Sequence, residues 1–128
     1  MVSANAIIAV VDDEWSVRTM LGRVLRLAGY RVTAFARGED FMASLATRLP
    51  DCAIVDIHMP QMTGFEVQAS LLEGKVPVPV ILITASDDAA LDDTARQLQV
   101  TRVLRKPFSG DVLLVAVSAA LVASGHDA

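Results

Sequence analysis

The fold class is decided by residues 6–29, which read AIIAVVDDEWSVRTMLGRVLRLAG. The continuous apolar run Ala6–Val11 is typical of a strand that is buried on both faces of a parallel sheet. After three acidic residues, apolar side chains recur at helical spacing from Val17 to Ala28, and Gly29 is placed to end the helix. This stretch therefore predicts a β-strand that leads directly into an α-helix.

The same alternation continues along the rest of the chain. Further strands are expected at Arg31–Phe35, Cys52–Ile57, Val78–Thr84 and Val100–Arg105, and further helices at Gly38–Ala46, Phe65–Glu73, Asp87–Leu98 and Gly110–Ala123. Five β-α units with short connections predict an α/β fold: one doubly wound, five-stranded parallel sheet with helices on both faces. The expected strand order is 2-1-3-4-5, as in flavodoxin-like folds. One domain is expected over residues 1–128, with its core at about 6–123.

Composition excludes several classes of protein. The net charge of −4 argues against direct nucleic-acid binding, which needs a basic face. Cys52 is the single cysteine, so an internal disulfide is impossible and a reducing compartment fits. The longest apolar stretch, Val112–Ala123, is shorter than the roughly 20 residues that span a bilayer, and the N-terminus lacks the basic start of a signal peptide. We therefore expect a cytoplasmic domain without membrane contact.

Polar residues lie at or directly after the ends of four of the five expected strands. In the order 2-1-3-4-5 these four strands are contiguous, and ligands of such sheets bind beyond the carboxyl ends of the strands. Carboxylates, a hydroxyl and an ammonium group should therefore converge on one pocket. The residues at these strand ends are Asp12-Asp13-Glu14, Asp56, Thr84 and Lys106.

This set of side chains favours phosphoryl transfer. Clustered carboxylates repel one another, and a hard divalent cation relieves the repulsion. Oxygen donors without a histidine or cysteine array suit Mg²⁺. An aspartate beside Mg²⁺ can attack phosphorus and form an aspartyl phosphate, while a lysine neutralises the phosphoryl oxygens.

Four short segments carry a more specific signal: VDDE at 11–14, DIHMPQMTG at 56–64, ITA at 83–85 and KPF at 106–108. Together they resemble the CheY-like receiver domain of two-component response regulators, and the flanking sequence looks most like FixJ-type receivers. The resemblance covers about residues 7–123. It implies a phosphorylation-controlled signalling switch and not an enzyme in the usual sense, although the domain would catalyse its own phosphorylation and dephosphorylation.

By this resemblance, Asp56 accepts a phosphoryl group from a sensor histidine kinase or a small phosphodonor. Asp13, Asp56 and the backbone carbonyl of His58 would bind Mg²⁺, with Asp12 acting partly through water. Lys106 would contact the phosphoryl group.

The resemblance also assigns the switch. Thr84 would reorient toward the phosphoryl group and alter the surface of the fourth helix, fifth strand and fifth helix for a downstream partner or output domain. The Lys106–Pro107 bond would be cis. The side chains expected at the rim of the pocket are those of Glu14, His58, Ala85 and Ser86.

The sequence departs from the family pattern in two places. Val103 stands three residues before the lysine, where receivers usually carry an aromatic switch residue, and a valine is too small and too stiff about χ1 to make that movement. The usual Gly-Ala pair before the fifth strand is replaced by residues 99–101, Gln-Val-Thr. We therefore expect the switch to act through Thr84 more than through position 103.

Several alternatives remain open on the sequence. The tail 124–128 is compatible with a chain end or with a linker, so the chain is either a single-domain receiver or the receiver portion of a longer DNA-binding transcription factor. The apolar helix Gly110–Ala123 is a candidate homodimer surface. A Mg²⁺-dependent phosphohydrolase is disfavoured because His58 stands where those enzymes need a second carboxylate. Asp51 is disfavoured as the phosphoacceptor because it precedes its strand.

Overall fold

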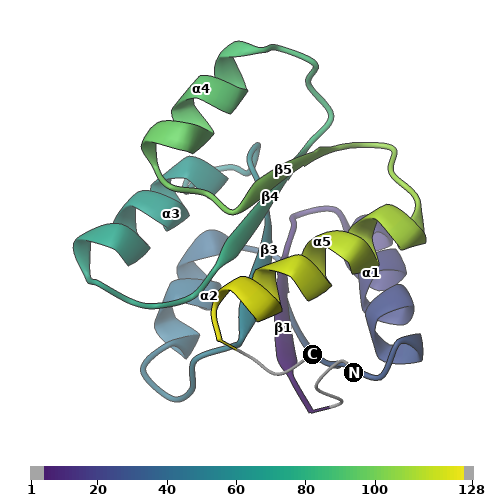
Figure 1. The fold of residues 1–128 in the computed structure, drawn as a ribbon. Coiled ribbons are helices and arrows are strands. Elements are labelled where there is room, and N and C mark those ends of the chain that lie inside the picture. The colour runs from purple at the N-terminus through teal and green to yellow at the C-terminus, as the bar shows by residue number, and fades with distance from the viewer. Residues whose placement is uncertain (1–4, 126–128) are drawn as a thin grey trace.

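A computed structural model describes residues 5–125, in which a five-stranded parallel sheet is covered by helices on both faces (Figure 1). The strands are β1 (Ile7–Val11), β2 (Arg31–Phe35), β3 (Cys52–Asp56), β4 (Val80–Thr84) and β5 (Arg102–Arg105). The helices are α1 (Trp15–Leu27), α2 (Gly38–Ser44), α3 (Gly64–Glu73), α4 (Ala90–Gln97) and α5 (Gly110–Ala123). The strand order β2-β1-β3-β4-β5 confirms the predicted topology.

Two hydrophobic clusters lie between the sheet and the helices, one on each face of the sheet. On one face of the sheet, Ile8 and Val10 pack with side chains of α1 and α5. On the other face, Ala9 and Val11 pack with side chains of α2, α3 and α4. Because both faces are covered, β1, β3 and β4 are buried along their whole length, whereas the edge strands β2 and β5 are only partly buried.

Some elements begin later than the sequence pattern predicts. The fourth helix begins at Ala90 and not at Asp87, because the Ser86 and Asp88 side chains accept backbone N–H bonds that hold this segment in turns. The fourth strand begins at Val80 and not at Val78, because Pro79 has no N–H to donate.

The start of β1 is tied to the residue that precedes β3. Asp51 donates its backbone N–H to the Ile7 carbonyl at 2.8 Å, and its carboxylate accepts the Ile7 N–H at 2.7 Å. Asp51 therefore lies at the amino end of the sheet, remote from the carboxyl ends where the other acidic residues gather. This is the position before β3 that the sequence predicts.

The last helix is buried on one side and exposed on the other. Leu113, Val117 and Leu121 are buried against the sheet, whereas Val112, Val115 and Val122 on the outer side are 41%, 61% and 51% exposed. Over residues 5–125, no helix combines the length and apolarity that crossing a membrane requires.

Candidate functional site

Three carboxylates meet at the carboxyl ends of two neighbouring strands. Asp12 and Asp13 follow β1, and Asp56 ends β3, which pairs with β1 up to Val11 and Val55. One carboxylate oxygen from each aspartate lies within 4.8 Å of the other two. Asp12 and Asp56 are buried and Asp13 is exposed. This all-oxygen set, open to solvent on one side, fits a hard divalent cation such as Mg²⁺.

Lys106 places its ammonium group against this cluster. Its Nζ lies 3.2 Å from an Asp12 oxygen, 3.5 Å from an Asp56 oxygen and 3.8 Å from a Glu14 oxygen. The backbone N–H of Lys106 donates to the Thr84 carbonyl at 2.7 Å, which fixes the end of β5 beside β4. The Lys106–Pro107 peptide bond is cis.

The protonation of the cluster follows from burial and charge. Burial raises the pKa of the Asp56 carboxyl above its ordinary value, the negative charge of Asp12 raises it further, and Lys106 only partly offsets them. Burial alone would lower the pKa of Lys106, but Asp12, Asp56 and Glu14 together raise it above its ordinary value. Lys106 is therefore a cation at neutral pH, and the Asp56 carboxylate is less stable than it would be in water.

The loop after β3 is shaped closely around Asp56. The His58 N–H donates to an Asp56 carboxylate oxygen at 3.3 Å, while the His58 side chain is exposed. The first residue of α3, Gly64, lies so close that a Cβ there would stand 2.6 Å from the Asp56 carbonyl oxygen. Thr63 and Glu66 form a reciprocal capping box that fixes the start of α3.

A second pair of contacts holds Asp12. Its Oδ1 accepts the Glu14 N–H at 2.9 Å, and its backbone carbonyl accepts a hydrogen bond from Arg18 Nη1 at 2.8 Å. Arg18 was not predicted from the sequence to belong to this site. Its only signal there was its position one helical turn beyond the acidic residues.

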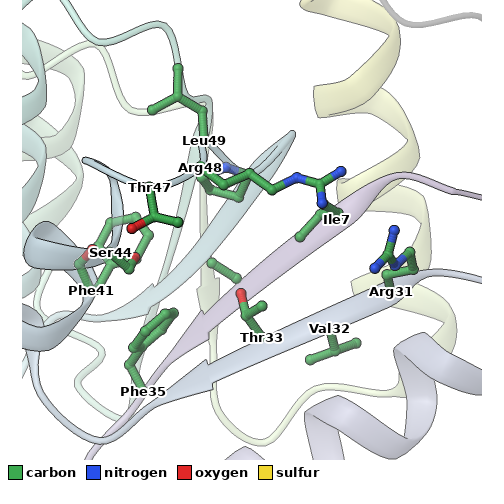
Figure 2. Close-up of a pocket in the computed structure, with 12 residues that line it drawn as sticks. Ile7, Arg31, Val32, Thr33, Phe35, Phe41, Ser44, Thr47, Arg48 and Leu49 are labelled. Atoms are coloured by element: carbon green, nitrogen blue, oxygen red, sulfur yellow. Dashed lines mark hydrogen bonds between the residues drawn. The ribbon is translucent and has the colours of Figure 1, made fainter.

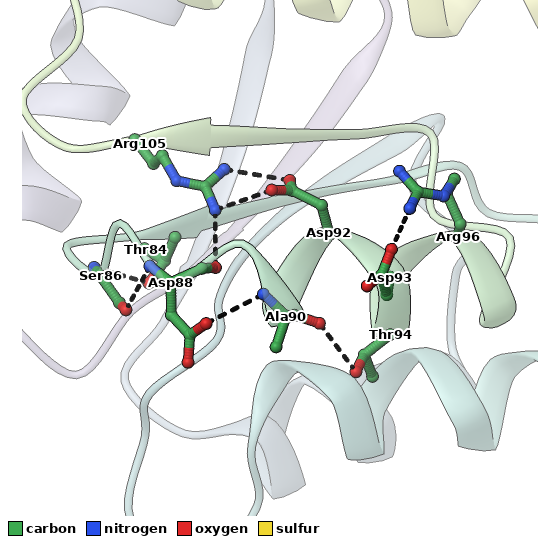
Figure 3. Close-up of polar contacts among 9 residues, drawn as sticks. All are labelled: Thr84, Ser86, Asp88, Ala90, Asp92, Asp93, Thr94, Arg96 and Arg105. Carbon is green, nitrogen blue, oxygen red and sulfur yellow. Dashed lines mark hydrogen bonds and ion pairs between the residues drawn. The ribbon is translucent and has the colours of Figure 1, made fainter.

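Thr84 lies at the end of β4 and begins a chain of side-chain hydrogen bonds toward α4 (Figure 3). Its buried hydroxyl oxygen accepts the Ser86 N–H at 3.0 Å. The Ser86 hydroxyl accepts the Asp88 N–H at 3.1 Å, and the Asp88 carboxylate accepts the Ala90 N–H at 2.9 Å. Ala85 and Glu14 are exposed and Ser86 is half-buried.

Arg105 joins β5 to α4 (Figure 3). Its two terminal nitrogens donate to the two Asp92 carboxylate oxygens, each at 3.0 Å, and one of them also donates to the Asp88 carbonyl at 3.0 Å. Sequence reasoning did not single out this pair, because charged residues on exposed elements are common. Val103 is half-buried and packs on the cluster that includes α4.

Comparisons with known proteins find response regulators. The family model described as the response regulator receiver domain matches residues 8–118. The transcriptional regulator NtrC of Salmonella typhimurium is 36% identical over 117 residues, which are 91% of this chain and 25% of NtrC. FixJ of Bradyrhizobium diazoefficiens is 30% identical over 114 residues, which are 89% of this chain and 56% of FixJ. The chain thus spans between a quarter and about half of these relatives.

Solved structures agree. A response regulator receiver protein from Burkholderia phymatum superposes with a TM-score of 0.82 at 38% identity, covering 96% of this chain and 98% of its own. The chemotaxis protein CheY4 of Vibrio cholerae superposes with a TM-score of 0.83 at 30% identity, covering 91% of this chain and 98% of its own.

Proposed function

This chain belongs to the receiver domains of response regulators, and on that premise we propose that it is a phosphorylation-controlled switch whose phosphoacceptor is Asp56. The observation that carries the proposal is the environment of this carboxylate. It is buried at the end of β3, beside Asp12 and Asp13, with Lys106 Nζ 3.5 Å from one of its oxygens. Receiver domains are signalling domains, so we do not assign this chain an enzymatic activity on other molecules.

The chemistry proposed for Asp56 is a displacement at phosphorus. A carboxylate oxygen forms a bond to the phosphorus of a phosphohistidine or a small phosphodonor, and the bond to the donor breaks with its electron pair leaving on the donor. Lys106 binds a phosphoryl oxygen and neutralises its charge. The domain's own residues catalyse this step and the later hydrolysis of the aspartyl phosphate.

Mg²⁺ is the cation that this site would hold. Asp13, Asp56 and the His58 carbonyl are its proposed ligands, and Asp12 acts partly through water. The bound cation supplies positive charge to the carboxylates and to the phosphoryl oxygens. The all-oxygen donor set within 4.8 Å supports this assignment.

The switch is proposed to pass through Thr84 to α4. A phosphoryl group on Asp56 attracts the Thr84 hydroxyl, which then gives up the hydrogen bond that it accepts from the Ser86 N–H. The chain of hydrogen bonds from Ser86 to Ala90 carries this change to the start of α4. Val103 is too small to take the place of an aromatic residue, so the surface of α4, β5 and α5 changes through the loop after β4.

Three kinds of partner are proposed for this domain. We propose phosphorylation by a sensor histidine kinase and readout by a downstream protein or an output domain, with no direct contact to nucleic acid by this domain. The exposed valines of α5 support a homodimer surface. A second candidate, the receiver portion of a longer DNA-binding transcription factor, is favoured by the greater length of NtrC and FixJ. Residues 1–128 are proposed as one domain.

Incubation with acetyl phosphate and Mg²⁺, followed by intact-mass spectrometry, tests the proposal. The native protein should gain one phosphoryl group and Asp56→Asn should gain none. Asp51→Asn is the matched control, because an asparagine oxygen can still accept the Ile7 N–H, and it should be phosphorylated like the native protein. Full phosphorylation of Asp56→Asn would refute the assignment.

A further inference from the structure

A cavity of about 410 Å³ lies between the edge of the sheet and α2, apart from the acidic site (Figure 2). Its lining includes Ile7 and Arg31, which pair at the amino ends of β1 and β2. The carboxylates described above lie at the opposite ends of the strands. The receiver chemistry therefore makes no use of this cavity.

The hollow results from a short helix over small side chains. The second helix has only seven residues and ends at Ser44, so the first halves of β1 and β2 are not covered by it. Ala9 and Thr33, which are paired across the two strands, line the bottom of the cavity. Their side chains are small, so the space above them stays open. Phe35 and Phe41, whose ring centroids are 5.7 Å apart in an edge-to-face arrangement, line the end nearest α2.

Two arginines line the other end of the cavity, where the Asp51 carboxylate also accepts the Ile7 N–H. Arg31, from β2, and Arg48, from the segment after α2, both line it, and their guanidinium groups lie on the Ile7 side (Figure 2). Over residues 5–125, neither guanidinium has an ion-pair partner within 4.0 Å, and the same is true of Arg18, Arg23, Arg26 and Arg102. In a chain of net charge −4, two unpaired arginines at one apolar cavity are complementary to an anion.

We propose that this cavity binds a small amphiphilic carboxylate, with its apolar body against Phe35 and Phe41 and its carboxylate group at Arg31 and Arg48. The volume lies within the range of roughly 300–1,000 Å³ that is common for small-molecule sites. Guanidinium groups bind carboxylates through paired, charge-assisted hydrogen bonds. The Thr33 and Thr47 side chains add hydroxyl groups to the lining. The proposal is independent of phosphorylation at Asp56.

The test compares two probes that differ mainly in charge, 4-phenylbutyrate and 4-phenyl-1-butanol, in amide-shift titrations of the ¹⁵N-labelled full chain. The acid should shift the amides of Thr33, Ser44 and Thr47. It should bind about tenfold more tightly than the alcohol, because only the acid makes charge-assisted hydrogen bonds.

Three variants assign the binding to the cavity. Arg31→Gln/Arg48→Gln should lower the affinity for the acid to that for the alcohol. Arg23→Gln/Arg102→Gln removes two other exposed arginines, changes the net charge equally, and should leave the affinity unchanged. Thr33→Leu puts a larger side chain at the bottom of the cavity and should weaken the binding of both probes. Thermal unfolding of each variant shows that it is folded.

Four results would overturn the proposal. The first is the absence of amide shifts at the lining residues, and the second is equal affinity for acid and alcohol. The third is unchanged affinity in the Arg31→Gln/Arg48→Gln variant. The fourth is a concentration-dependent shift of β2 amides without any probe, because a second copy of the chain would then occupy this edge.

Discussion

Gly64 shows how a single residue constrains the strand that ends at Asp56. A Cβ at this position would lie 2.6 Å from the Asp56 carbonyl oxygen and 3.0 Å from the Ile57 Cα, and both are backbone atoms that cannot rotate away. Gly64→Ala should therefore lower the free energy of unfolding by about 1–3 kcal/mol, the usual cost of overpacking. Urea denaturation measures this difference.

Gly74→Ala is the matched control for that substitution. Gly74 has helical φ and ψ angles, and a Cβ there makes only ordinary contacts at 3.4 Å. Its replacement should be neutral or slightly stabilising, since alanine reduces the entropy of the unfolded chain. Equal destabilisation by the two substitutions would show that the contact with Asp56 is not the cause.

The raised pKa of Asp56 predicts how the stability of the protein depends on pH. Because the folded-state pKa of this carboxyl is raised, its ionised form costs stability once the pH exceeds that pKa, and this cost is absent below the ordinary value of 3.8. Without metal, Asp56→Asn should melt at a higher temperature than the native protein at pH 7. The difference should shrink as the pH falls toward 3.8. A variant that is less stable at pH 7 would contradict the pKa direction.

Single residues differ in how far their place could be predicted from sequence. Asp12, Asp56 and Lys106 could be placed because each lies at or directly after the end of a predicted strand, and parallel strands bring their carboxyl ends together. The place of Asp51 before β3 could also be predicted, but its hydrogen bonds and those of Arg18 could not. These side chains bond to backbone atoms of Asp12 and Ile7, and every residue has such atoms, so the sequence does not show which one a side chain will contact.

At the scale of elements, the Arg105–Asp92 contact between β5 and α4 predicts how firmly that helix is held. Arg105→Gln should have little effect on global stability, because both side chains are about one-third or more exposed and solvent screens the pair. It should nevertheless speed amide hydrogen exchange in α4. The measurement is hydrogen exchange followed by mass spectrometry or NMR.

Arg96→Gln provides the control, since Arg96 pairs with Asp93 within α4 itself and joins the helix to no other element. Arg96→Gln should change the amide hydrogen exchange of α4 less than Arg105→Gln does. If both substitutions speed exchange equally, the link to β5 is not what holds the helix.

Element boundaries were predictable where local chemistry agrees with periodicity. The fifth helix begins at Gly110 as predicted, because the Ser109 hydroxyl accepts the Val112 N–H and caps it. The fourth helix begins three residues later than predicted, because Ser86 and Asp88 use their side chains to hold turns that an apolar pattern cannot reveal. The cavity beside α2 was also not predicted, since it depends on where that helix stops.

For the whole molecule, Mg²⁺ binding should appear as a gain in stability. The folded chain brings the carboxylates together and the unfolded chain does not, so a Mg²⁺ concentration 100 times the dissociation constant should add about 2.7 kcal/mol. Calorimetry with and without Mg²⁺ measures the gain. Asp13→Ala should remove most of it, although this exposed residue contributes little to the metal-free fold.

Asp111→Ala removes an equal charge from the exposed start of α5 and should retain the full response to Mg²⁺. A response that is equally large in Asp13→Ala would place the metal elsewhere.

The paired hydrogen bonds between Asp51 and Ile7 set the longitudinal alignment of two strands whose far ends carry the carboxylates. Counting from Ile7, Asp12 lies five residues, or about 16 Å, along the strand direction. A slip of one residue at the amino end would turn every later side chain to the opposite face. Asp12 and Asp56 would then no longer stand abreast. The spacing of the acidic site thus depends on a residue at the amino ends of the same two strands, which is not part of that site.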